Sequence, residues 1–358
     1  MSIKEIAQRA GVSQSTVSRV LNNPEYRCST PEKRDMIWQI ARELDYVPNE
    51  SARNLKMGVG KKEEKNYYIS ILLTRTDATQ TDPFFTELLH VIETEIHRNL
   101  CIFSNMWYDQ RFSSEKKSRN SELDAVVREM AAESEGKCDG LIVVGKCSKE
   151  ALKKLKKHFK NIVAVNRNPH NQEVDEIVCD GRKIATKAVE HLISLGHKNI
   201  GYVGECHNES RYKGFTETLE KHDIELIPEY VMETKQTEAE GFEVMNKFLH
   251  SDDMPTGIYC ANDITAVGML KCLKKSRNRY FTPSIISSDD IEEGRYTTPM
   301  LTTIGLPKEE MGKFALNLLL DRIKGEHKSI VHLELEGRLI NRESCVLMSE
   351  SSWNDYII

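Results

Sequence analysis

The 358-residue sequence lacks the features that would place a protein in a membrane or outside the cell. It has no apolar run near the roughly 20 residues that a membrane-spanning helix requires. Its N-terminus, MSIKEIAQRAG, lacks the apolar core of a signal peptide. Its nine cysteines include no Cys-x-x-Cys pair, which argues against a zinc site or a disulfide framework. We therefore expect a cytoplasmic protein without a metal or a membrane partner.

The motifs of common enzyme classes are absent as well. The sequence contains no nucleophile elbow, dinucleotide-binding fingerprint or phosphate-binding loop. Gly58 and Gly60 precede Lys61, but this spacing does not match a phosphate-binding loop. Asp289 and Asp290 are adjacent, so their carboxylates would point apart in an extended segment and make poor acid–base partners. These observations predict a protein that is not an enzyme and needs no cofactor.

Length and charge indicate more than one domain. Hydrophobic residues make up 39% and charged residues 29% of the chain, which is typical of globular proteins. The length exceeds one ordinary domain and predicts two or three. Residues 1–65 hold 12 Lys/Arg against 9 Asp/Glu, whereas the remaining residues hold 38 against 46. This asymmetry favours a DNA-facing head on an acidic body.

Residues 1–47 have the apolar periodicity of three short helices. Gly11 permits a tight turn after the first helix, and Ser13 can cap the second. Val17 and Val20 lie on one face of the second helix, so they predict a buried stripe. The opposite face is then available to a partner.

The outward face of this second helix has side chains that match the chemistry of DNA. Arg19 can bind guanine and Gln14 can bind adenine through paired hydrogen bonds. Short hydroxyl and amide side chains suit phosphates, which fix position without specifying sequence. The candidate DNA-binding residues of this region are Ser13, Gln14, Ser15, Thr16, Ser18, Arg19 and Asn22. A generic amphipathic helix could present the same polar face to solvent without binding DNA.

From residue 66 onward, short apolar runs alternate with amphipathic helical stretches. This alternation predicts parallel sheets with helices on both faces. A stretch of roughly 290 residues is too long to fold around a single hydrophobic core, so it predicts two lobes. The expected fold is an all-α head plus an α/β body of two doubly wound parallel-sheet lobes. We expect lobe 1 at about 66–165 and 305–328, and lobe 2 at about 166–304 and 329–349.

Two motifs resemble the lactose-repressor/galactose-repressor family of bacterial transcriptional regulators. Residues 10–22 read AGVSQSTVSRVLN, and residues 43–49 read ELDYVPN, followed by Ala52 and Leu55. The loop of residues 23–29 is longer than in the family, but it does not touch the recognition face. The resemblance implies a helix-turn-helix head (1–47), a hinge helix and linker (48–65), and a two-lobed ligand-sensing and dimerisation domain (66–349).

The resemblance also assigns roles in DNA binding. Gln14 and Ser15 would select operator bases, and Asn49 would begin a short hinge helix that lies in the minor groove. Ala52 and Leu55 would face the DNA, with Leu55 as a wedge between base pairs. A helix this short is unstable alone in water, so we expect it to fold only against DNA and a partner hinge.

The body resembles a periplasmic sugar-binding protein, and ligands of such sheets bind beyond the carboxyl ends of strands. The implied ligand-binding residues are Phe84, Arg167, Arg211, Asn262 and Asp289. Charged planar groups give directional hydrogen bonds to adjacent hydroxyls, and an aromatic ring packs on the apolar face of a sugar.

Some of these side chains have plainer roles open to them. Phe84 and Phe85 cannot both face a ligand, so at least one is expected in the core. Asp263 is expected only to cap the helix that follows it. Gly305 stands where a sugar-binding relative would place an amide, so the identity of the sugar stays open.

The sequence therefore predicts a repressor that binds a pseudo-palindromic double-stranded operator as a homodimer and is released by a small polar effector, with a sugar as the expected class. The alternative is a global catabolite regulator whose body binds a phosphocarrier protein. A pulldown from extract, compared with thermal-shift screening against sugars, would separate the two. The operator sequence, the regulated genes and the direction of the effector's action stay open.

Overall fold

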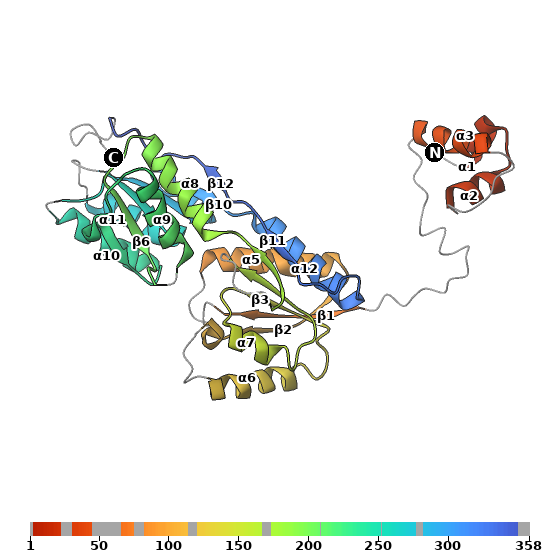
Figure 1. Ribbon diagram of the computed structural model, residues 1–358, viewed down its shortest axis with the longest axis horizontal. Coiled ribbons are helices and arrows are strands. Elements are labelled where there is room, and N and C mark those ends of the chain that lie inside the picture. The colour runs from red at the N-terminus through yellow and green to blue at the C-terminus, as the bar shows by residue number, and fades with distance from the viewer. Residues whose placement is uncertain are drawn as a thin grey trace. The chain divides into compact units, whose positions relative to one another are not determined.

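The computed structural model describes residues 3–22, 31–44, 66–74, 82–113, 120–166, 173–207, 209–251, 253–276 and 282–349. The chain forms two compact units, Met1–Lys65 and Asn66–Ile358 (Figure 1). Within the described ranges, no helix is long and apolar enough to span a membrane.

The N-terminal unit is a three-helix domain. Its helices are α1 (Ile3–Ala10), α2 (Gln14–Asn22) and α3 (Pro31–Glu43). Gly11, at φ +63°, makes the turn between α1 and α2, and Ser13 Oγ accepts a hydrogen bond from Thr16 N at 3.1 Å. All three helices contribute to one small core, made of Ile6, Ala7, Val17, Val20, Leu21, Ile37, Ala41 and Leu44. The three predicted helices are therefore present.

The second unit contains two six-stranded sheets. In spatial order, the first sheet is β2 (Ile102–Tyr108), β1 (Tyr68–Leu73), β3 (Gly140–Val144), β4 (Ile162–Asn166), β5 (Asp175–Val178) and β11 (His332–Glu334). The second sheet is β7 (Val231–Glu233), β6 (Ile200–Gly204), β8 (Gly257–Cys260), β9 (Ser284–Asp289), β10 (Thr302–Gly305) and β12 (Arg338–Ile340). Neighbouring strands are parallel except β10 and β12.

Helices cover both faces of each sheet (Figure 1). The first sheet packs on α5 (Pro83–Arg98) and α12 (Lys308–Lys324) on one face, and on α6 (Asn120–Glu133) and α7 (Lys149–Leu155) on the other. The second sheet packs on α8 (Gly181–Ser194) and α9 (Ser210–Lys221), and on α10 (Glu238–Leu249) and α11 (Asp263–Ser276). Short 3₁₀ helices are η1 (Gln110–Ser113), η3 (Pro228–Tyr230) and η4 (Glu292–Arg295). The predicted doubly wound α/β body is confirmed.

The chain passes between the sheets after β5, after β10 and between β11 and β12. Lobe 1 is therefore longer than the expected 66–165 and 305–328, because β5 and β11 both belong to its sheet. The sequence of β5, Asp-Glu-Ile-Val, does not resemble a buried strand because it begins with two carboxylates. Asp175 is nevertheless fully buried. Its carboxylate charge is compensated there, because Arg322 binds its two oxygens at 2.5 and 2.6 Å and His327 binds one of them at 2.9 Å.

Candidate functional site

The outward face of α2 presents polar side chains on a rigid support. Gln14, Ser15 and Arg19 are exposed, whereas Val17 and Val20 are buried against the other two helices. This separation places an amide, a hydroxyl and a guanidinium on one side of a packed helix, which is the geometry that direct reading of base edges needs.

Hydroxyl groups gather at the N-terminus of α2. Ser13 Oγ lies 2.8 Å from Ser15 Oγ and 2.9 Å from Thr16 Oγ1. Hydroxyl donors beside the positive end of a helix suit a phosphate oxygen. Ser18 is half-buried on the same helix. The side chain of Asn22 lies outside the described residues, as do three predicted hinge contacts, Asn49, Ala52 and Leu55.

The predicted effector residues of lobe 2 follow neighbouring strands. Arg211 follows β6 in the first turn of α9, Asn262 follows β8, and Asp289 is the last residue of β9. The chain leaves β6 for α9 on one face of the sheet and leaves β8 for α11 on the other. Strands β6 and β8 are adjacent, so this is the topological switch point at which α/β sheets bind their ligands.

Arg211 is the centre of a buried polar network. Its side chain is 2% exposed, and Nε donates to Glu209 Oε1 at 2.8 Å. Nη1 donates to the carbonyl oxygen of Ala261 at 2.5 Å, and Nη2 contacts Gln236 Oε1 at 3.4 Å. The amide of Asn262 donates to the carbonyl oxygen of Gln236 at 3.1 Å, which joins the loops after β6, β7 and β8. We call Glu209, Arg211, Gln236 and Asn262 the arginine network.

The charge of Arg211 depends on Glu209. Burial works against the protonated guanidinium, but the adjacent carboxylate of Glu209 outweighs it and raises the pKa of Arg211. Three N–H groups of Arg211 are engaged by these contacts, whereas a guanidinium has five. The remaining donors, one on each Nη, form a fork that suits adjacent hydroxyls or a carboxylate.

Tyr259 connects the arginine network to Asp289. Burial raises the pKa of the Tyr259 phenol; Arg211 lowers it, and Glu209 and Asp289 raise it further. These groups therefore lie within electrostatic reach of one ring. Tyr259 Oη is 3.0 Å from Ser288 Oγ, next to Asp289 on β9. The structure thus brings three predicted residues, Arg211, Asn262 and Asp289, to one end of the second sheet.

Asp263 does more than cap a helix. It is the first residue of α11, and it is fully buried. Its carboxylate accepts hydrogen bonds from Ser287 Oγ at 2.5 Å, Thr303 Oγ1 at 2.6 Å and Ile291 N at 2.9 Å. Burial raises the pKa of Asp263, and the two hydroxyl bonds oppose that rise. The side chain holds β9, β10 and the start of α11 together.

Phe84 has a different environment from the one expected. Its ring is fully buried in the core of lobe 1, where it packs edge-on against Phe85 at a centroid distance of 5.2 Å. Both rings are therefore core side chains in this structure, because the N-terminal turn of α5 points both inward. Phe84 is linked to Asp289 only through Lys308. The Lys308 Nζ atom lies 5.8 Å from the centroid of the Phe84 ring and donates a hydrogen bond to the carbonyl oxygen of Asp289. Arg167 lies outside the described residues.

Two residues of the arginine network, and Lys308 beside the end of β9, were not predicted. Glu209 lies two positions before Arg211 in the sequence, and this short separation was the signal that could have identified it as the partner of Arg211. Gln236 follows β7, a three-residue strand too short for a periodicity pattern. Lys308 had no sequence signal, because its partners lie far away along the chain.

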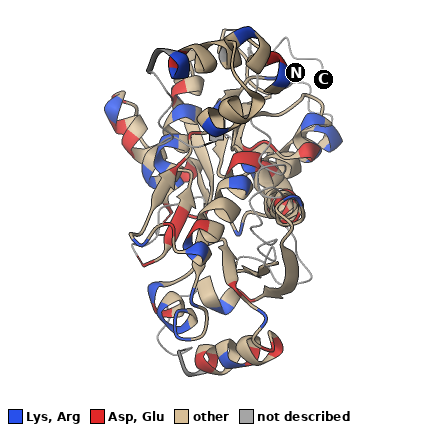
Figure 2. Ribbon diagram, turned by 90° about the vertical axis from the view of Figure 1, so that its right-hand side faces the viewer, with Lys and Arg blue, Asp and Glu red and all other residues tan. Residues whose placement is uncertain are grey.

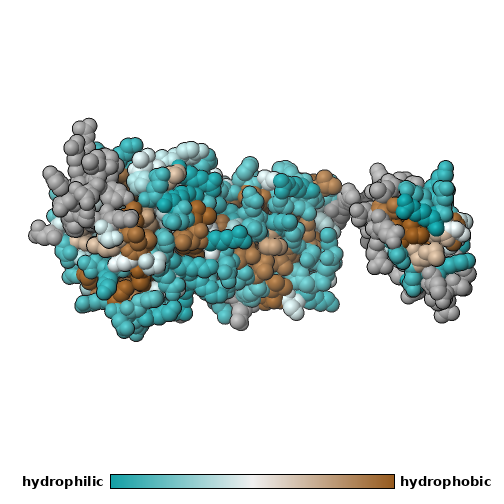
Figure 3. Space-filling model, turned by 90° about the horizontal axis from the view of Figure 1, so that it is seen from above, coloured by the Kyte–Doolittle hydropathy of each residue, from teal (hydrophilic) through white to brown (hydrophobic). Residues whose placement is uncertain are grey.

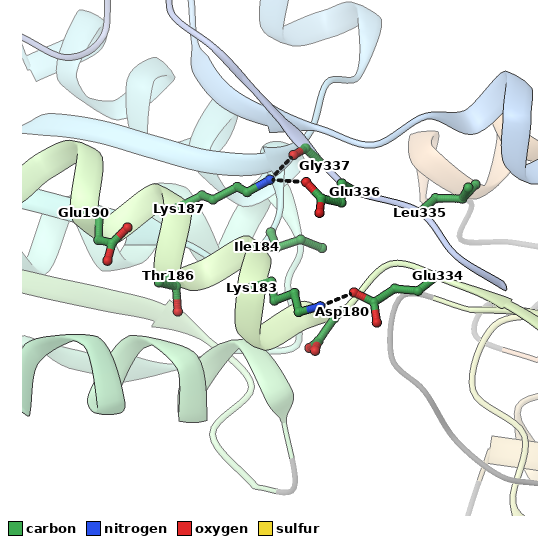
Figure 4. A pocket seen from close by; sticks show the side chains of 10 residues that line it. All are labelled: Asp180, Lys183, Ile184, Thr186, Lys187, Glu190, Glu334, Leu335, Glu336 and Gly337. Carbon is green, nitrogen blue, oxygen red and sulfur yellow. Dashed lines mark hydrogen bonds and ion pairs between the residues drawn. The ribbon is translucent and has the colours of Figure 1, made fainter. Parts of the chain in front are cut away.

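A separate cavity of about 250 Å³ lies between α8 and residues 334–337 (Figure 4). Lys183 Nζ binds Glu334 Oε1 at 2.6 Å across it, and Lys187 Nζ binds Glu336 Oε2 at 3.2 Å. These pairs connect lobe 2 to the segment that leaves β11.

Charged and hydrophobic residues are both intermixed with others in the views shown. Lys and Arg are interspersed with Asp and Glu along the helices (Figure 2). Hydrophobic side chains lie among hydrophilic ones on the face shown in Figure 3. Among the described residues, Tyr296 is the most exposed large hydrophobic side chain, at 78%.

Comparisons with known proteins agree with this architecture. Residues 2–49 match the model for bacterial regulatory proteins of the lacI family, and residues 189–345 match a periplasmic binding protein-like domain. The HTH-type transcriptional repressor PurR of Haemophilus influenzae (strain PittGG) is 30% identical over 361 residues, covering 96% of this chain and 98% of PurR.

Solved structures show the same fold. A LacI-family transcriptional regulator from Enterococcus faecium with bound ribose is 26% identical, with a TM-score of 0.64, covering 78% of this chain and 99% of that one. The lac repressor dimer bound to operator and the anti-inducer ONPF is 21% identical, with a TM-score of 0.65, covering 97% of this chain and 99% of that one.

Proposed function

The chain belongs to the lacI family of bacterial regulatory proteins, and from that premise we propose that it is a transcriptional repressor whose head binds operator DNA and whose body binds a small-molecule effector. The observation that carries this function is the face of α2, where Gln14, Ser15 and Arg19 are exposed over a buried Val17 and Val20. It is a binding protein and not an enzyme.

The operator is proposed to be a pseudo-palindromic duplex bound by a homodimer. Each chain supplies one recognition helix, so two-fold symmetry predicts two half-sites. The lac repressor structure described above is a dimer on its operator, which supports this assembly. The hinge residues Asn49, Ala52 and Leu55 are proposed to enter the minor groove between the half-sites. The protein would then act in the cytoplasm, at the nucleoid.

The effector is proposed to bind at the carboxyl ends of β6, β8 and β9. The two remaining guanidinium donors of Arg211, the amide of Asn262 and the carboxylate of Asp289 are the polar groups that would contact it, together with Arg167. Directional donors and acceptors on a rigid sheet edge suit a polyol, and the Enterococcus faecium regulator holds ribose. Binding is proposed to release the operator.

Two experiments test this function. Selection from random duplexes should give inverted half-sites, and Arg19→Ala should weaken binding to the selected sequence by about 10- to 100-fold while relaxing the preference at one position per half-site. Only single, asymmetric selected sites would contradict the dimeric operator. A thermal-shift screen of sugars should identify a compound that raises the melting temperature and weakens binding to the selected duplex.

A further inference from the structure

Lys308 contacts both lobes at one point. It is the first residue of α12, and its side chain is 13% exposed. Nζ forms an ion pair with Glu87 Oε2 at 2.6 Å, and it donates hydrogen bonds to the carbonyl oxygen of Asp289 at 3.0 Å and to that of Asp290 at 2.7 Å. An ammonium group has three N–H donors, and the two carbonyl groups accept from two of them.

Glu87 holds the same segment from a second helix. It lies on α5 of lobe 1, and its other carboxylate oxygen accepts a hydrogen bond from Glu292 N at 3.0 Å. Glu292 begins η4, three positions after the last residue of β9 in lobe 2. Two lobe 1 helices, α5 and α12, therefore hold residues 289–292 of lobe 2 through one ion pair. We call residues 289–292 the β9 turn.

The β9 turn has a strained backbone. Asp289 has φ +130° and Asp290 has φ +54°, values that side-chain-bearing residues rarely adopt. Such residues persist where the surrounding structure holds them, and they concentrate at ligand clamps and switches. Within lobe 2, Arg295 and Arg342 bind the Asp290 carboxylate. Lys308 binds the two carbonyl groups that this unusual backbone turns towards lobe 1.

We propose that Lys308 and Glu87 form an inter-lobe latch on the β9 turn, which holds the lobes in the arrangement seen here and couples effector binding at Asp289 to lobe movement. This inference rests on the proposed effector site. Two-lobed binding proteins close around ligands by hinge motion, and a ligand shifts that equilibrium only through contacts that differ between the two arrangements. Asp289 supplies such a difference, because its own carbonyl group is held by the latch. Lys308 acts through Asp289 and is a positioning residue.

The chain contains a matched control for an ordinary ion pair. Lys183 of α8 binds Glu334 of β11, also between the lobes and also at 2.6 Å (Figure 4). Their side chains are 60% and 41% exposed, against 13% and 33% for Lys308 and Glu87. Solvent screens the exposed pair, so its loss should have little effect. If Lys308→Met and Lys183→Met behave differently, the effect comes from where Lys308 lies, on the β9 turn, and not merely from the loss of one ion pair between the lobes.

Hydrogen exchange of the full-length protein without added small molecule tests the latch. In Lys308→Met, peptides that contain residues 289–296 should exchange at least tenfold faster than in the wild type, while peptides of β6 and β8 stay unchanged. Lys183→Met should match the wild type throughout, and Lys308→Arg, which keeps the charge, should restore part of the protection. Unchanged exchange in Lys308→Met, or a uniform increase across both sheets, would overturn the latch.

A second measurement tests coupling with ribose as the probe. Lys308→Met should bind ribose within about threefold of the wild type, but the change in operator affinity at saturating ribose should shrink at least fivefold. Equal changes in both proteins would overturn the coupling. Failure of the wild type to bind ribose would contradict the proposed sugar and not the latch, which the exchange comparison decides alone.

Discussion

Replacing Arg211 with alanine should destabilise the body as well as impair effector binding. The Glu209 side chain is 6% exposed, so Arg211→Ala removes the guanidinium that binds a buried carboxylate. Breaking a buried pair in this way costs about 3–5 kcal/mol. At roughly 2–4 °C per kcal/mol for a unit of this size class, the melting temperature of the body should fall by about 6–20 °C. From the sequence alone we would expect no such loss, because Glu209 was not recognised as a partner.

A second variant separates the structural role of Arg211 from its role in binding. Glu209→Gln combined with Arg211→Ala removes both charges of the buried pair. We expect it to melt several degrees above Arg211→Ala, because the two effects are not additive for residues in direct contact. Effector affinity should stay low in both. Loss of a charged hydrogen bond costs about 1.5–3 kcal/mol, which corresponds to roughly 10- to 150-fold weaker binding.

The assay is calorimetric. Unliganded melting curves of the wild type, both single variants and the double variant give the coupling energy of the pair. Isothermal titration with the sugar from the thermal-shift screen gives the effector affinity of each. Wild-type effector affinity in the double variant would refute a contact between Arg211 and the effector, and would leave the guanidinium a purely structural role. Additive losses in melting temperature would refute the calculation from Glu209 burial.

Four further predictions concern DNA, assembly and pH. Operator affinity should fall steeply with salt, and Leu55→Ala should reduce DNA bending in a gel-mobility assay without changing effector affinity. Tyr296, at 78% exposure, is expected at a dimer contact, so Tyr296→Asp should give single chains by light scattering; unchanged dimers would exclude it. Burial lowers the pKa of His197 below 6.5, so its contribution to stability is present above about pH 6.5 and is lost as the pH falls towards the folded-state value. The loss of melting temperature between about pH 7.5 and 5.5 should therefore be smaller in His197→Gln, and an equal slope would contradict the assignment.

Local patterns in the sequence predicted most of the secondary structure. The head helices follow from apolar residues three and four positions apart, with Gly11 at the turn, and these signals depend only on near neighbours. The strands β1, β3, β4 and β8 are short apolar runs buried on both faces, and they too are visible locally. The placement of Arg211, Asn262 and Asp289 at strand ends followed from the alternation of strands and helices.

Tertiary structure decided the partners of those residues. Strand β5 begins with Asp175, whose charge is compensated by Arg322, 147 positions away, so no local pattern could identify the strand as buried. The burial of Arg211 depends on a carbonyl group 50 positions along the chain, and the link from Glu87 to Glu292 spans 205 positions. Periodicity records which face of an element is apolar. Which distant charge makes a buried polar group tolerable is settled only when the chain brings the two together.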